Sequence, residues 1–164
     1  MILEVCVDSV ESAVNAKLGD ADRIELCGDL VVGGITPSLA LYERIREKID
    51  IPIHVLLRPR FGDFLYSEEE LEVLIRQAKM FAEAGADNLV IGCLTTDGRL
   101  DLEAMKKIIY DISGVETNLI RFPGGSSNTV SKSYCLGIMS TLSKMVRERG
   151  YQYFDWNVTS GDAG

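Results

Sequence analysis

Residues 51–92 read IPIHVLLRPRFGDFLYSEEELEVLIRQAKMFAEAGADNLVIG. The segment begins with a short apolar run, Ile53–Leu57, and ends with another, Asn88–Gly92. Between them, apolar residues recur at the spacing of an amphipathic helix, at Leu71, Leu74, Ile75, Ala78, Phe81 and Ala82. Ser67 and Glu70 are spaced as a capping box, and Gly85 suits a left-handed helix end. The segment therefore predicts a strand, a helix and a second strand.

The same unit recurs along the whole chain. The predicted strands are Ile2–Val7, Arg23–Cys27, Ile53–Leu57, Asn88–Gly92, Asn118–Phe122 and Tyr151–Asn157. Parallel strands joined by helices form either a closed barrel or an open doubly wound sheet. No Gly-rich GxGxxG motif opens the first helix, which disfavours a dinucleotide-binding sheet. We therefore predict an α/β fold of the TIM-barrel kind, with about six β/α units.

The chain is shorter than a complete barrel. It has 164 residues, whereas an eight-stranded barrel needs roughly 200 to 250. Six units would leave two strand edges open, and an open edge invites pairing with another copy. We therefore predict a partial barrel that closes through a homodimer or by an altered arrangement of its strands.

Composition excludes several classes of function. The apolar content of 46% supports a sizeable core, but no apolar run is long enough to span a membrane. A formal charge of −8 disfavours nucleic-acid binding, which needs clustered basic side chains. The start MILEVCVDSV does not resemble a secretory signal, so we expect a cytoplasmic protein. The four scattered cysteines are expected to be reduced thiols.

Charged residues cluster at the carboxyl ends of the predicted strands, where barrels carry their functional sites. One interpretation is an anion-binding pocket built by Arg58, Arg60 and Arg121, because guanidinium groups suit carboxylates and phosphates. The other is a buried polar layer in which charges neutralise one another, formed by Glu4, Glu25, His54 and Arg58. Strand alternation places each of these sets on one face of its strand.

Two cysteines offer a further site. Cys6 and Cys27 fall at equivalent places on neighbouring predicted strands, so their sulfurs could share a soft ion such as Cu(I). The alternative is that both are small buried apolar side chains, which is common for free cysteine.

The chain changes in composition near Glu116. The first 116 residues carry 12 basic and 22 acidic side chains, whereas the last 48 carry 5 and 3. We mark a seam there, within a single barrel-like domain of residues 1–164.

Residues 1 to about 113 resemble the CutC family of copper-homeostasis proteins. The resemblance rests on LEVCVDSVESAVNA, ADRIELC, GGITPS, IPIHVLLRPRFGDFLYSEEE and LTTDGRLD. It implies a TIM barrel and copper ligands in the EVC and ELC motifs, which fall on Cys6 and Cys27. The family's HRAFD-like strand is absent.

Residues 117–164 resemble polysaccharide deacetylases of the NodB-like kind. The motifs are NLIRFPGGSSNTVSKSYCLGIM and GYQYFDWNVTSGDAG. This resemblance implies that Arg121 orients a catalytic base and that Trp156 lies near the acetyl pocket. Those enzymes hold a metal with one Asp and two His, and a chain with one histidine cannot supply that site.

Together these resemblances lead to a hypothesis of a chimeric, engineered barrel scaffold. Its parts would be a CutC-like fragment, residues 1–116, and a deacetylase-like fragment, residues 117–164. We expect no complete active site, no catalysis and no cofactor. The alternatives are a Cu(I)-binding CutC-like protein and the remnant of a metal-dependent carbohydrate deacetylase.

Overall fold

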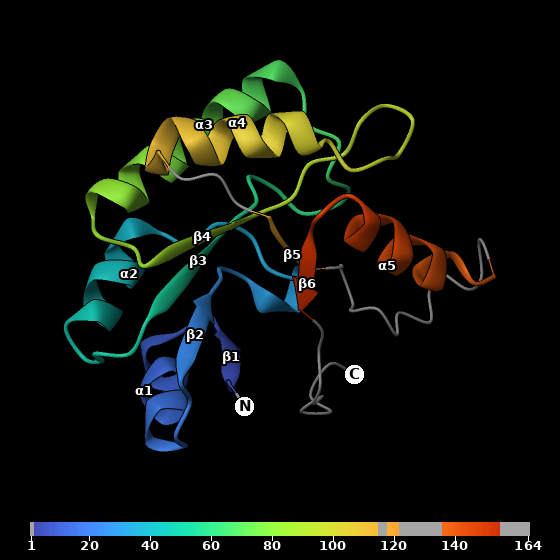
Figure 1. Cartoon of the computed structure of the whole chain (residues 1–164). Coiled ribbons are helices and arrows are strands. Elements are labelled where there is room, and N and C mark those ends of the chain that lie inside the picture. The colour runs from blue at the N-terminus through green and yellow to red at the C-terminus, as the bar shows by residue number, and fades with distance from the viewer. Residues whose placement is uncertain (1, 115–117, 122–135, 155–164) are drawn as a thin grey trace. The chain divides into compact units, whose positions relative to one another are not determined.

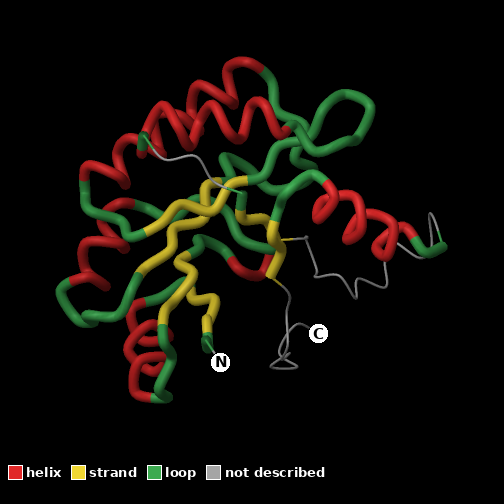
Figure 2. The backbone as a smooth tube through the Cα atoms, viewed as in Figure 1, coloured by secondary structure: helices red, strands yellow, loops and turns green. Residues whose placement is uncertain are grey.

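Strands and helices alternate along the chain, as Figures 1 and 2 show. The structure is a computed structural model and describes residues 2–114, 118–121 and 136–154. The strands are β1 Glu4–Val7, β2 Arg23–Leu26, β3 Ile53–Leu57, β4 Asn88–Ile91, β5 Leu119–Arg121 and β6 Gln152–Phe154. The helices are α1 Val10–Leu18, α2 Leu39–Arg46, α3 Glu68–Glu83, α4 Leu102–Ser113 and α5 Ile138–Glu148, with a 3₁₀ turn η1 at Leu30–Val32.

The chain divides into two compact units, Met1–Val115 and Glu116–Gly164. In the first unit, β1, β2, β3 and β4 lie side by side in that order, and every neighbouring pair is parallel. This order is the one expected of consecutive β/α units, because each helix carries the chain to the next parallel strand.

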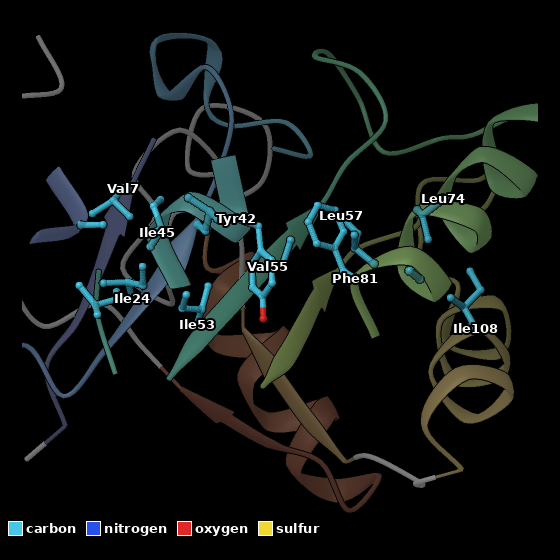
Figure 3. Packing of buried hydrophobic residues seen from close by; sticks show 14 of the residues in the cluster. Val7, Ile24, Tyr42, Ile45, Ile53, Val55, Leu57, Leu74, Phe81 and Ile108 are labelled. Atoms are coloured by element: carbon cyan, nitrogen blue, oxygen red, sulfur yellow. The ribbon is translucent and has the colours of Figure 1, made fainter. Parts of the chain in front are cut away.

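The core of the first unit lies between the sheet and its helices. Along β3, Ile53, Val55 and Leu57 are buried and alternate with less buried residues. Tyr42 of α2 and Phe81 of α3 pack edge to face, with ring centroids 5.7 Å apart (Figure 3). Each such buried side chain contributes about 1.5–3 kcal/mol to folding.

Helix α3 has the ends that the sequence predicts. The Ser67 side chain accepts a hydrogen bond from the Glu70 backbone N–H, and the Glu70 carboxylate accepts one from the Ser67 N–H. Gly85 follows the helix with a φ of 84°, a conformation that glycine adopts without strain. The predicted capping box and left-handed stop are both confirmed.

The second unit is smaller. Its strands β5 and β6 pair in parallel, with Ile120 opposite Tyr153, and α5 connects them in sequence. Val146 and Ser143 are the buried residues of α5. Predicted residues Phe122, Cys135 and Asp155 to Asn157 lie outside the described residues.

The predicted α/β class with parallel strands is confirmed, but the strands do not form one closed barrel. Among the described residues they form a four-stranded sheet and a separate two-stranded sheet. Counting β/α units gives the number of strands, whereas closure depends on which edges find a hydrogen-bonding partner.

Candidate metal centre

Cys6 and Cys27 lie on the same face of the first sheet, near the carboxyl ends of β1 and β2. In the register of this pair, Cys6 lies opposite Glu25, and Cys27 comes two residues after Glu25. The two cysteines are therefore diagonal neighbours and do not lie directly opposite one another, which corrects the predicted equivalence of their positions. Alternation of side chains still places both on the face that points away from the helices.

The two thiols differ in exposure. Cys6 is half-buried, whereas Cys27 is only 2% exposed. The Cys27 thiol points toward the Glu25 carbonyl, with Sγ 3.9 Å from the oxygen. Cys6, Cys27 and Cys93 form no disulfide within the described residues, and Cys135 lies outside them. An ion that reached this pair would meet Cys6 first.

A polar layer covers the same face toward the amino end of the strands. The Glu4 carboxylate lies 2.5 Å from Arg23 Nε and 3.3 Å from His54 Nδ1. The other ring nitrogen of His54, Nε2, lies 3.0 Å from the Asn88 amide nitrogen. Buried charges need such partners because the protein interior does not solvate them. Of the four residues predicted for the polar layer, Glu4 and His54 come together, and Arg23 supplies the positive charge expected from Arg58.

Arg58 occupies the opposite end of β3 and is 7% exposed. Its Nη1 donates to the carbonyls of Gly33 and Gly34, at 3.2 and 2.8 Å, and its Nη2 donates to the Gly62 carbonyl at 2.5 Å. The guanidinium also lies 4.7 Å from the centre of the Phe64 ring. These contacts tie the loop after β2 to the loop after β3.

Arg60 is engaged by carboxylates. Its Nε lies 2.5 Å from Glu70, and its Nη2 lies 3.0 Å from Asp63. The hydrogen bond to Glu70, followed by that to Asp63, raises the pKa of Arg60, and the same bond to Arg60 lowers the pKa of Glu70. The side chain therefore closes the β3–α3 loop on itself.

The other predicted site residues belong to the second part of the chain. Arg121 is the last residue of β5 and lies opposite Phe154 in the register. Trp156 lies outside the described residues. Arg58 and Arg60 belong to the first compact unit and Arg121 to the second. The anion pocket of these three residues therefore stays a prediction.

The described residues contain no cluster of three or more His, Cys, Asp or Glu side chains that could hold a metal ion. Any metal site on this face would therefore have to be built from the two thiols. Two sulfur ligands suit a soft ion of low coordination number, such as Cu(I), whereas structural zinc sites need four ligands.

Sequence reasoning missed one feature of this site, the turn at Gly33 and Gly34. Both residues have positive φ, of 87° and 84°, and Gly34 packs against Cys27. The Gly-Gly pair is a recognisable turn signal. Its contact with Cys27 could not be predicted, because the sequence does not show the path of the loop that folds back onto this residue.

Comparison with known proteins decides the family. The model of the CutC family matches residues 1–132. The chain belongs to the CutC family. The match includes both cysteines and runs past the predicted seam near Glu116.

The CutC relatives include curated proteins from distant organisms. The chain is 55% identical over 105 residues to a human "Copper homeostasis protein cutC homolog", covering 62% of this chain and 37% of that protein. It is 46% identical over 109 residues to a CutC family protein of Xanthomonas campestris, covering 66% and 45%. The chain thus spans less than half the length of these relatives.

Solved structures support the fold. A CutC protein from Streptococcus agalactiae matches with a TM-score of 0.68 and 24% identity, covering 99% of this chain and 76% of that one. A deacetylase catalytic domain from Eubacterium rectale matches with a TM-score of 0.42 and 27% identity, covering 99% and 62%. A score this low establishes no shared fold.

The hypothesis of an engineered chimeric scaffold is wrong. CutC family membership over residues 1–132 and the high identity to natural homologues favour the alternative hypothesis of a CutC protein. The hypothesis rested on a second resemblance over residues 117–164, but the CutC match continues across the predicted seam to residue 132, into that same segment.

No helix among the described residues is both long enough and apolar enough to cross a membrane.

Proposed function

We propose that this chain binds Cu(I) through Cys6 and Cys27 and acts in copper homeostasis. The observation that carries the proposal is the placement of two thiols on one face of adjacent strands β1 and β2. Its human and mouse relatives are named copper homeostasis proteins, which points the same way. Those relatives are longer, so the activity of the whole protein is part of the proposal.

Sheet geometry makes the pair a plausible two-ligand site. Strands lie about 4.8 Å apart and rise about 3.3 Å per residue, so diagonal neighbours have Cα atoms roughly 8 Å apart. The side chains of Cys6 and Cys27 leave the same face and can turn toward each other across that span. Thiolate ligands select Cu(I) over hard cations such as Mg²⁺ or Ca²⁺.

Binding at this site releases protons, because the thiolate is the ligand and the thiol is not. We therefore propose that copper affinity rises with pH in the neutral range. We also propose that the chain is a binding protein without catalysis of its own, since ligand exchange at two thiols needs no general acid or base.

An anaerobic Cu(I) titration against a competing chelator tests the proposal. We expect one tightly bound Cu(I) per chain, lost in Cys6→Ser and in Cys27→Ser. Cys93→Ser is the matched control, because this third thiol is equally buried but lies beyond β4. Stoichiometric binding that survives both ligand substitutions would overturn the assignment. Circular dichroism of each variant separates loss of a ligand from loss of the fold.

A further inference from the structure

The turn at Gly33 and Gly34 covers the buried thiol of Cys27. A Cβ atom added at Gly34 would lie 3.4 Å from Cys27 Sγ and 2.9 Å from Leu56 Cδ2. The second distance is too short for a real side chain, so the backbone of the turn rests directly on this part of the sheet. Cys27 lies beneath this contact and is 2% exposed.

The centre of this turn depends on Arg58. The Arg58 guanidinium donates to both carbonyls of the turn, Gly33 O and Gly34 O. Its other hydrogen bonds lie within the turn, from Gly33 N to Leu30 O at 2.8 Å and from Val32 N and Gly34 N to Asp29 O at 3.1 and 3.2 Å. At the base of the turn, Gly28 and Ile35 exchange two backbone hydrogen bonds of 2.8 Å, which keep the base beside Cys27.

The ends of the loop are held by other groups. At its start, the Leu30 N–H donates to the Asp8 carboxylate at 3.1 Å. At its end, the Thr36 N–H donates to the Arg58 carbonyl at 2.9 Å, and the Arg58 N–H donates to Thr36 Oγ1 at 2.8 Å. These bonds involve the backbone of Arg58 and survive a change of its side chain. Loss of the guanidinium therefore releases the centre of the loop and leaves its ends in place.

Burying the charge of Arg58 at this position costs free energy of folding. It is buried, its Nε has no hydrogen-bond partner, and no carboxylate of the described residues lies within ion-pair distance of it. Its charge is stabilised by three carbonyl dipoles and by the face of the Phe64 ring. A buried cation held only by dipoles stabilises the fold less than an apolar side chain of similar size would. The specific role that the structure gives Arg58 is to bind the carbonyls of Gly33 and Gly34.

We infer that Arg58 is a positioning residue that holds the Gly33–Gly34 turn closed over Cys27 and so controls access to this thiol. With the turn closed, reagents and ions reach the pair from the side of the half-buried Cys6. When these two contacts are lost, the centre of the turn can move away from Cys27 by local opening while the Gly28–Ile35 pair holds its base, so Cys27 becomes more open to attack without unfolding of the sheet. The consequence for copper rests on the proposed function, whereas control of thiol access does not.

Site-resolved alkylation tests the inference without copper. The full chain is treated with iodoacetamide under reducing-agent-free, anaerobic conditions, and mass spectrometry follows the labelling of each cysteine with time. Because Arg58→Gln removes the charge-assisted hydrogen bonds to both carbonyls of the turn, it should speed labelling of Cys27 by roughly tenfold or more. The Cys93 rate should change little. Arg58→Lys keeps a hydrogen-bond donor, so its Cys27 labelling rate should lie between the rates of the unchanged protein and of Arg58→Gln.

Arg60→Gln is the matched control. It removes the same charge two residues further along and releases Asp63 and Glu70, but has no contact with the Gly33–Gly34 turn. We expect it to leave the Cys27 rate unchanged. Unchanged Cys27 labelling in Arg58→Gln would overturn the inference, and so would equal acceleration of Cys27 and Cys93, which indicates general unfolding. Since the assay contains no copper, failure of the copper titration leaves its result intact.

Discussion

Burial sets the chemistry of individual residues in this protein, and Cys93 is the clearest example. It follows β4, is 2% exposed, and accepts a backbone hydrogen bond from Asp101 through its carbonyl. Burial, and then the nearby Asp101 carboxylate, raises the pKa of the Cys93 thiol to about 11. Tyr66 is affected in the same way, since burial raises its pKa to about 12. Both groups stay neutral in the folded chain well above neutral pH.

The pKa of Cys93 makes the stability of the fold depend on pH. Between about pH 9 and 11 the unfolded thiol has lost its proton while the folded thiol keeps it. The unfolded state then binds fewer protons, so the free energy of unfolding falls as pH rises, by about 2–3 kcal/mol in all. Urea unfolding at pH 8, 9 and 10 should show this decline, and Cys93→Ala should make it shallower. Parallel declines in the two proteins would show that Cys93 has no part in it.

At the scale of single residues, sequence reasoning succeeded where strand alternation decides the answer. It placed Cys6 and Cys27 on one face, and it grouped Glu4 with His54. It failed for Arg58, whose partners are backbone carbonyls of two loops. A guanidinium group favours anions, but the paths of the two loops place the carbonyls of Gly33, Gly34 and Gly62 within hydrogen-bonding distance of Arg58.

Helices of the first unit are defined by their ends as much as by their apolar faces. In α3 the Ser67 and Glu70 side chains each accept a hydrogen bond from an otherwise unsatisfied N–H of the first turn. Ser9, Ser38 and Asp101 cap α1, α2 and α4 in a similar way. The sequence shows such caps directly because donor and acceptor are only three residues apart.

Removal of the α3 cap should destabilise the first unit. Ser67→Ala is expected to lower the free energy of unfolding by about 1 kcal/mol, because the Glu70 backbone N–H loses its acceptor, Ser67 Oγ. Chemical denaturation followed by circular dichroism measures the change. Lys79→Ala, at an exposed position within the same helix, should have a much smaller effect. Equal effects of the two substitutions would rule out a capping role.

The sequence predicts where the strands lie better than it predicts which strands pair. The sequence located all six strands to within a few residues, because each is a short apolar run between turn signals. It could not show that β5 pairs with β6 in a sheet separate from β1–β4. Pairing joins residues far apart in the chain and is decided by edges and closure, for which a single sequence carries no local signal.

At the scale of the whole molecule, the four-stranded sheet has β1 and β4 at its edges. Ile2 and Leu3, next to β1, are 62% and 41% exposed. An edge strand beside exposed apolar residues is a site at which a second copy can add. The homodimer stays a prediction, and the β1 edge is the surface at which we expect it to form.

Light scattering measures the assembly directly. We expect a mass of twice the 18.1 kDa of one chain, and we expect Ile2→Lys with Leu3→Lys to shift the population to single chains. Val31→Lys is the control, since Val31 is 95% exposed in the 3₁₀ turn η1 after the carboxyl end of β2, whereas Ile2 and Leu3 precede β1. A single-chain mass for the unchanged protein at all concentrations would end the dimer hypothesis.

The diagonal register of Cys6 and Cys27 also bears on oxidation. A disulfide requires Cα atoms within about 7 Å, whereas sheet geometry separates diagonal neighbours by roughly 8 Å. Direct oxidation of the pair to a disulfide would therefore require the backbone of β1 or β2 to move. A bridging ion lengthens the link by two sulfur–metal bonds and fits the unmoved strands better. The two-residue offset in the register would thus let the same two thiols share the proposed metal while resisting the disulfide that would consume them.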